Sequence, residues 1–148
     1  MANIGIYVGT VYGNALLVAE QAEPLLVAAG HQVQIFEEPD LSQWLDESIN
    51  VRLIVTSTTG QGELPDSIAG LYYAMKEQTG YQPSVRYGVI ALGDSSYENY
   101  CAAGLLFDEL LQEHQAQRIA DVLLIDAGEH PEPEEVALPR IEQWAGLL

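Results

Sequence analysis

The chain has 148 residues, 48% of them hydrophobic, which is enough for one domain that buries roughly two-thirds of its unfolded surface. Its 22 acidic and 5 basic residues give a net charge of −17, which excludes nucleic acid and anionic membrane surfaces as partners because both would repel it. The single cysteine, Cys101, excludes an internal disulfide and multi-cysteine metal sites. With no signal peptide and no apolar run of about 18 residues, we expect a cytoplasmic protein with a single domain over residues 1–148.

Strands and helices alternate along the first part of the chain. The near-continuous apolar run NIGIYVG at 3–9 predicts a buried strand, and a helical pattern follows from about Asn14 to Ala29. The segment HQVQIFEE at 31–38 alternates only partly, which indicates an edge strand. The segment VRLIVTS at 51–57 is apolar almost throughout, as is typical of a central strand with helices on both faces.

The alternation continues through the middle of the chain. The segment LPDSIAGLYYAMKEQTG at 64–80 predicts a helix that Asp66 or Ser67 caps. The segment RYGVIALG at 86–93 then predicts a second central strand, because it is apolar over nearly its whole length.

The last third of the chain repeats the same pattern. A helix is predicted from about Asn99 to His114, and RIADVLLIDA at 118–127 predicts a fifth strand. A final helix over 133–148 is expected to be interrupted, or to begin late, at Pro139 because proline lacks the backbone donor of a helix interior.

Five strands that alternate with helices favour an α/β fold, a three-layer sandwich around a five-stranded parallel sheet. With the partly alternating segment at the edge, the strand order is 2-1-3-4-5. In such sheets ligands bind beyond the carboxyl ends of the strands where the winding reverses, here between strands 1 and 3.

Three polar loops follow the predicted strands at that edge of the sheet. They are GTVYGNA at 9–15, TSTTGQGELPDS at 56–67 and LGDSSYENYC at 92–101. Glycine and small hydroxyl residues let backbone amides approach a ligand closely, and the first loop enters a helix amino end, which favours an anion. It lacks the glycine-lysine-serine ending of nucleoside triphosphatases. The three loops together therefore predict one ligand site that includes a phosphate.

These three motifs, at this spacing, resemble those of the flavodoxin family, and the resemblance covers essentially the whole chain. The segment DVLLIDA at 121–127 is similar to the fifth strand of short-chain, stand-alone members, which lack an insertion there. The resemblance implies a flavodoxin-like fold and bound FMN, and flavodoxin is itself the standard example of this strand order and ligand position.

The resemblance also implies which residues of the first loop bind the FMN phosphate. Tyr12 and Ala15 stand where threonines are usual in the family, so hydroxyl contacts worth about 1 kcal/mol each are lost and the FMN affinity is expected to be lower than is typical. The implied phosphate ligands are Thr10, Val11, Tyr12, Gly13, Asn14 and Ala15.

The other two loops are implied to hold the flavin ring. Thr59 occupies a position that is often aromatic, so one face of the ring lacks an aromatic cover, while Tyr97 stacks on the other face. The backbone amides of Asp94 and Cys101 meet the pyrimidine edge, and Gly93 permits the close approach. The implied ring-binding residues are Thr58, Thr59, Gly60, Gln61, Gly62, Leu92, Gly93, Asp94, Tyr97, Asn99, Tyr100 and Cys101.

The resemblance predicts a one-electron carrier, which needs neither a general base nor a nucleophile. We expect the three histidines to be solvated and away from the converging loops: His31, His114 and His130. Carboxylates near the ring are expected to oppose its reduction and to produce a low-potential donor. These carboxylates are Glu63, Asp66, Asp94 and Glu98.

The expected partners are a flavodoxin reductase and acceptor redox enzymes with basic surfaces, and the expected state is a monomer. The alternative function is a small FMN-dependent NAD(P)H quinone reductase, although such enzymes are commonly longer. A phosphoacceptor signalling domain is excluded, because it needs acids where this chain has Gly9, Thr10, Thr56 and Ser57.

Overall fold

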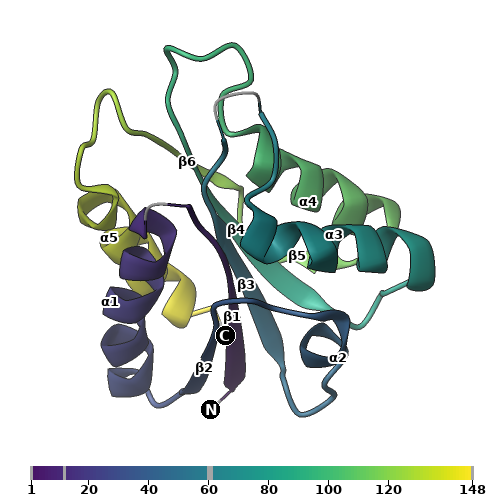
Figure 1. The fold of residues 1–148 in the computed structure, drawn as a ribbon. Coiled ribbons are helices and arrows are strands. Elements are labelled where there is room, and N and C mark those ends of the chain that lie inside the picture. The colour runs from purple at the N-terminus through teal and green to yellow at the C-terminus, as the bar shows by residue number, and fades with distance from the viewer. Residues whose placement is uncertain (1, 12, 60–61, 148) are drawn as a thin grey trace.

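A parallel β-sheet forms the centre of the molecule (Figure 1). The computed structural model describes residues 2–11, 13–59 and 62–147. The predicted α/β fold and strand order are confirmed: the strands follow the order β2-β1-β3-β4-β5, and β6 also pairs with β4. The strands are β1 (Asn3–Gly9), β2 (Gln32–Phe36), β3 (Val51–Thr56), β4 (Arg86–Gly93), β5 (Gln117–Arg118) and β6 (Leu123–Asp126). The helices are α1 (Asn14–Ala28), α2 (Leu41–Trp44), α3 (Asp66–Gln78), α4 (Ala102–Glu113) and α5 (Pro133–Ala145).

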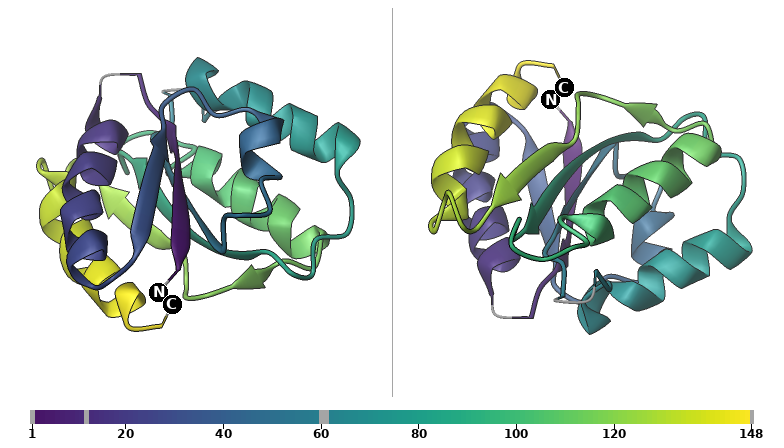
Figure 2. Two further views of the ribbon diagram at one scale, coloured as in Figure 1. Left: turned by 90° about the horizontal axis from the view of Figure 1, so that it is seen from below. Right: turned by 90° about the horizontal axis from the view of Figure 1, so that it is seen from above.

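Helices cover both faces of the sheet, α1 and α5 on one side and α3 and α4 on the other (Figures 1 and 2). Successive residues of β4 enter opposite cores: Ile90 packs with α1 and α5, whereas Ala91 packs with α3 and α4. The central strands are therefore apolar at every position, and β2, which pairs only with β1, alternates as an edge strand does. Within the described ranges, no helix is long and apolar enough to span a membrane.

The predicted fifth strand is divided into β5 and β6, so the described residues form six strands and not the five that were expected. Arg118 of β5 lies opposite Tyr87, and Leu123 of β6 lies opposite Ile90. Four residues, 119–122, thus face two residues of β4, and the extra pair leaves the ladder as a bulge. The displaced segment is used in packing, because Ile119 and Ala120 contact the core beneath α1 and α5.

The sequence analysis did not predict the short helix α2, although the residues before it carry a recognisable helix-start pattern. Asp40 and Gln43 form a capping box: the Asp40 carboxylate accepts from the Gln43 backbone amide at 2.9 Å, and the Gln43 side chain accepts from the Asp40 amide at 3.1 Å. The helix places Trp44 in the core, in contact with Tyr7. Beside it, the buried Arg52 donates to the backbone carbonyls of Trp44, Asp46 and Ile49, which accounts for a cation inside the molecule.

Three helix boundaries differ from the prediction. Helix α3 begins at Asp66 after Pro65, and neither Asp66 nor Ser67 caps it; the Ser67 hydroxyl instead accepts from the Thr10 amide at 3.1 Å. Helix α4 begins at Ala102, three residues later than expected. Helix α5 continues through Pro139, which lies on the exposed side where water can bind the carbonyl that a proline leaves without a partner.

Two helical glycines allow the packing of α4 to be tested. A Cβ at Gly104 would overlap the Cβ of Ala91 and lie 3.1 Å from its Cα, whereas a Cβ at Gly70 on α3 meets nothing within 4 Å. We expect Gly104→Ala to lower the free energy of unfolding by about 1–3 kcal/mol through overpacking. The matched change Gly70→Ala should raise it by about 0.5–1 kcal/mol through helix propensity. Urea denaturation measures both, and changes of the same sign would contradict this account.

Candidate functional site

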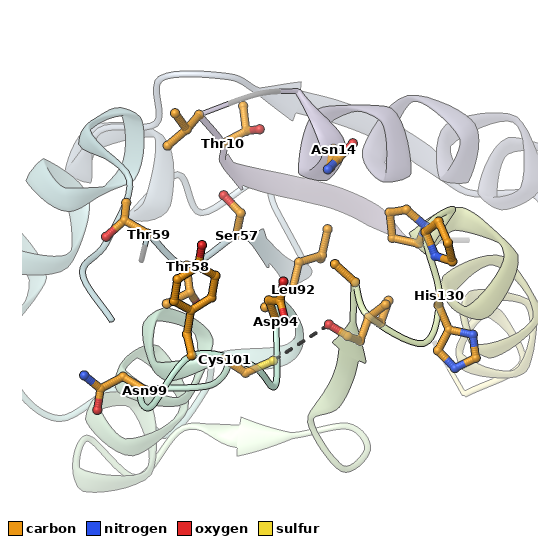
Figure 3. A pocket seen from close by; sticks show the side chains of 17 residues that line it. Thr10, Asn14, Ser57, Thr58, Thr59, Leu92, Asp94, Asn99, Cys101 and His130 are labelled. Atoms are coloured by element: carbon orange, nitrogen blue, oxygen red, sulfur yellow. Dashed lines mark hydrogen bonds between the residues drawn. The ribbon is translucent and has the colours of Figure 1, made fainter. Parts of the chain in front are cut away.

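One cavity of about 410 Å³ opens at the carboxyl edge of the sheet (Figure 3). Its volume lies within the range of about 300–1,000 Å³ that is typical of small-molecule sites. It is located where the winding of the sheet reverses between β1 and β3, as expected for this topology. The lining residues are Thr10, Val11, Asn14, Ser57, Thr58, Thr59, Leu92, Gly93, Asp94, Tyr97, Asn99, Cys101, Ile125, Ala127, His130, Pro131 and Pro133.

The first wall of the cavity is the amino end of α1. Gly13 precedes the helix with a φ of 92°, in the left-handed region that favours glycine, and its amide donates to the Thr10 hydroxyl at 2.8 Å. Among the residues that the structure describes, no side chain caps the helix, and its first turn carries no acidic residue. In a chain with 22 acids, an uncapped, acid-free helix amino end on a cavity wall fits a bound anion such as a phosphate.

The second wall is a closed turn after β3. The Thr59 amide donates to the Glu63 carbonyl at 3.0 Å, and the Thr59 hydroxyl accepts from the Glu63 amide at 3.1 Å. The Thr58 hydroxyl accepts from the Ala103 amide at 3.3 Å and so connects this turn to the first turn of α4. These bonds hold Thr58 and Thr59 in position beside the cavity.

The third wall is the loop after β4. The side chain of Tyr97 lines the cavity and remains 56% exposed, so it stands at the mouth and not in the core. The Asp94 carboxylate accepts from the Ser96 amide at 2.9 Å, which closes the turn that precedes Tyr97. An aromatic ring on a turn fixed by hydrogen bonds can cover one face of a flat ligand.

Cys101 ends this loop in a strained conformation. Its φ of 56° lies in the left-handed region, which costs a non-glycine residue of order 1 kcal/mol. A Cβ at Gly93 would come 2.7 Å from the Cys101 amide nitrogen, so the glycine accommodates the returning backbone. The Cys101 thiol donates to the Ala91 carbonyl at 3.3 Å, and burial raises the pKa of that thiol. A buried, protonated thiol is a packing group and not a nucleophile.

The fourth wall, the segment after β6, was not predicted from the sequence. Asp126, the last residue of β6, accepts from the Ser95 amide at 3.0 Å and from the Gly128 amide at 2.9 Å, so one carboxylate joins this segment to the loop after β4. These hydrogen bonds, first of all those from Ser95, lower the pKa of Asp126. The sequence did offer a signal, because Asp126 is an acid at the carboxyl end of the predicted fifth strand. That end lies at the same edge of the sheet as the other three loops.

The structure brings eleven predicted site residues to this cavity: Thr10, Val11, Asn14, Thr58, Thr59, Leu92, Gly93, Asp94, Tyr97, Asn99 and Cys101. It places four others outside the lining. Ala15 is a buried residue of α1, Gly13 precedes that helix, and Gly62 and Tyr100 border a neighbouring surface hollow. The predicted residues Tyr12, Gly60 and Gln61 lie outside the described residues. Sequence reasoning missed Ser57, Ile125, Ala127, His130, Pro131 and Pro133.

The expectation that the three histidines are solvated and away from the converging loops was wrong for His31, which is buried, and for His130, which lines the cavity. His31 is buried, and its Nδ1 atom accepts from the Ala2 amide at 3.0 Å. The His114 ring lies 2.8 Å from the side-chain amide of Gln82. His130, expected away from the converging loops, lies on the cavity wall because β6 is parallel to β4 and its loop therefore leaves the sheet at the same edge.

A doubly wound parallel sheet with a cavity at the reversal point defines a flavodoxin-like α/β protein. The sequence profile described as flavodoxin matches residues 6–139. The chain is 63% identical to Flavodoxin YqcA of Pectobacterium carotovorum subsp. carotovorum, over 100% of this chain and 98% of that protein. It is 60% identical to Flavodoxin YqcA of Escherichia coli, over 100% of this chain and 99% of the relative.

A solved structure of a mutant flavodoxin from Pseudomonas aeruginosa superimposes with a TM-score of 0.91 at 37% identity, over 99% of this chain and 98% of that chain. The chain belongs to the flavodoxin family, as one of its short members. Proteins of this family bind FMN and carry electrons.

The connection that Asp126 makes gives a stability test with a defined pH dependence. Because the folded state lowers the pKa of Asp126, its stabilisation is present above the unfolded value of about 3.9 and is lost as the pH falls through the folded value. We expect Asp126→Ala to lower the urea midpoint at pH 7, and the gap to the parent protein to close in acid. Asp126→Asn keeps an acceptor oxygen and should lose less at pH 7. A gap that stays constant into acid would argue against this role.

Proposed function

We propose that the cavity at the carboxyl edge holds FMN and that the protein is a low-potential, one-electron carrier between a reductase and acceptor enzymes. The observation that carries the proposal is the amino end of α1, which is uncapped, free of acids and open to the cavity in a molecule of charge −17. Membership of the flavodoxin family supports the same cofactor.

The residues present fit the two ends of FMN. The first-turn amides of α1, beginning at Asn14, and the hydroxyl of Thr10 would hold the phosphate. The turn at Thr58 and Thr59 and the ring of Tyr97 would border the flavin. Bound there, FMN supplies a group that takes up and releases electrons one at a time.

The charges around the cavity support a low potential. Glu63, Asp66 and Glu98 are exposed and Asp94 lines the cavity, and each of these carboxylates disfavours added negative charge nearby. At about 10 Å and an effective dielectric constant of about 40, one carboxylate contributes roughly 0.8 kcal/mol. Several such groups would lower the potential by of order 100 mV before salt screening.

An acid placed in the first turn of α1 tests the phosphate site. We expect Asn14→Asp to weaken FMN binding five- to tenfold through repulsion of about 1 kcal/mol or more, while riboflavin, which has no phosphate, binds as before. The apoprotein itself should not be destabilised, because an acid at a helix amino end is favourable. Titrations followed by flavin fluorescence give both affinities.

The matched control is Asn50→Asp, the same chemical change at the opposite edge of the sheet, just before β3. It should leave the affinity for FMN and for riboflavin unchanged. Equal losses of FMN affinity in the two variants, or equal losses of both ligands in Asn14→Asp, would contradict a phosphate at α1.

The distribution of charge supports docking to basic partners. Exposed acids follow three strands at the carboxyl edge of the sheet: Glu63 and Asp66 after β3, Glu98 after β4, and Glu129 and Glu132 after β6. The five basic residues lie elsewhere: Arg52 and Arg86 near the amino ends of β3 and β4, Arg118 in β5, Lys76 in the last turn of α3 and Arg140 within α5. A partner with a basic surface would therefore be steered toward the face that exposes Tyr97.

Charge reversal tests the steering with a basic one-electron acceptor as the probe. We expect the chemically reduced holoprotein to reduce ferricytochrome c at a second-order rate that falls as salt rises from about 0.01 M to about 0.1 M. Glu98→Lys should slow this rate several-fold at low salt. The control Glu47→Lys, an exposed site between α2 and β3, should slow it much less.

A rate that does not respond to salt would rule out steering. The carrier role itself is checked by adding NADPH and a quinone to the holoprotein without a separate reductase. Multiple turnover in that mixture would favour the alternative, a small FMN-dependent quinone reductase.

A further inference from the structure

Thr10, on the cavity wall, is held by a serine from a distant part of the chain. The Ser67 hydroxyl accepts from the Thr10 backbone amide at 3.1 Å and donates to the Thr10 backbone carbonyl at 3.4 Å, the longer and weaker of the two bonds. One side chain thus binds both backbone groups of a residue 57 positions away. Thr10 lines the cavity, whereas Ser67 is not one of the described residues that line it. Ser67 therefore acts on a ligand through the residue that it holds.

A close approach between the end of β1 and the first turn of α3 lets this contact form. A Cβ at Gly9 would lie 2.4 Å from the Cγ2 atom of Ile68, so the absence of a side chain at Gly9 is required here. Ile68 follows Ser67 directly and is fully buried. The amides of Ile68 and Ala69 both donate to the Pro65 carbonyl at 3.0 Å. The turn that carries Ser67 is therefore fixed in place.

The hydroxyl of Thr10 is its polar group that is available to a ligand, because Ser67 already binds the backbone amide and carbonyl. The hydroxyl oxygen accepts from the amide of Gly13, just before α1, at 2.8 Å, which leaves the hydroxyl hydrogen to be donated. An ionised phosphate oxygen only accepts, so it suits this donor. Thr10 lies on the same side of the cavity as Asn14, the first residue of α1 (Figure 3).

We propose that Ser67 is a positioning residue for the phosphate: by fixing the backbone of Thr10, it presents the Thr10 hydroxyl to the ligand and increases the preference of the site for FMN over riboflavin. The inference rests on the proposed FMN site and adds to it a residue of α3. Bonds made within the protein hold Thr10 in place, which lowers the entropy lost when the phosphate binds.

The test compares the affinities of the apoprotein for FMN and for riboflavin, which has no phosphate, in titrations followed by flavin fluorescence. We expect Ser67→Ala to lower the riboflavin-to-FMN ratio of dissociation constants roughly three- to tenfold, through weaker binding of FMN alone. Alanine favours a helix more than serine does, so α3 itself is not weakened. Ser67→Thr keeps the hydroxyl and should retain most of the selectivity.

The matched control is Ser84→Ala, the same chemical change at an exposed position just before β4, at the opposite edge of the sheet. It should leave both affinities unchanged. Urea denaturation of each apoprotein checks the fold. A purely structural role of Ser67 would weaken the binding of both flavins equally and leave their ratio as it is in the parent protein.

A double variant tests whether Ser67 acts through Thr10. Thr10→Val removes the hydroxyl and keeps the shape of the side chain, so it should itself lower the selectivity for FMN. If Ser67 only positions that hydroxyl, Ser67→Ala should cost little more once the hydroxyl is gone, and the double variant should match Thr10→Val. Two independent contributions would instead multiply.

Selectivity in Ser67→Ala that equals that of the parent protein overturns the inference, and so do losses that multiply in the double variant. The phosphate site itself is tested separately by Asn14→Asp, so failure of the Ser67 inference is distinguishable from failure of the proposed function. If the parent protein binds neither flavin, the proposed cofactor site is wrong and this inference is wrong with it.

Discussion

The whole arrangement depends on the direction of the strands. In a parallel sheet each strand ends at the same edge, and the helix that follows begins there, so the positive ends of helix dipoles collect at one rim. Helices α1, α4 and α5 begin at Asn14, Ala102 and Pro133, and Asn14, Cys101 and Pro133 line the cavity. Backbone amides thus create an anion site in a molecule with almost no basic side chains.

This device explains how an acidic protein can hold an anion and still repel added electrons. The field of a helix end falls off within its first turn, so it acts on a phosphate that touches it. The carboxylates around the rim act over longer distances through partly screened solvent. A short-range attraction at α1 and a longer-range repulsion around the exposed Tyr97 therefore coexist, and in the carrier role that we propose the same acids would face a partner.

Much of the fold and of the site followed from sequence patterns whose physical cause is local. Continuous apolar runs marked the central strands because both faces of β3 and β4 are buried. Glycine-rich and hydroxyl-rich loops after β1, β3 and β4 marked the cavity because parallel strands bring their ends together. Helix α2 could have been predicted from the sequence, because Asp40 and Gln43 have the spacing of a capping box. The bulge at 119–122 could not, because it depends on how Ile119 packs in the tertiary structure.

By itself the sequence determined the α/β alternation, the strand order, the acidity and three of the four loops that surround the cavity, because each depends on neighbouring residues or on a general rule of chain handedness. Only the tertiary structure decided that Asp126 connects two loops, that Cys101 adopts a left-handed conformation and that His130 joins the cavity wall. These features depend on contacts between segments far apart in the chain, and the spacing of residues along one strand does not encode where a bulged neighbour will place its loop.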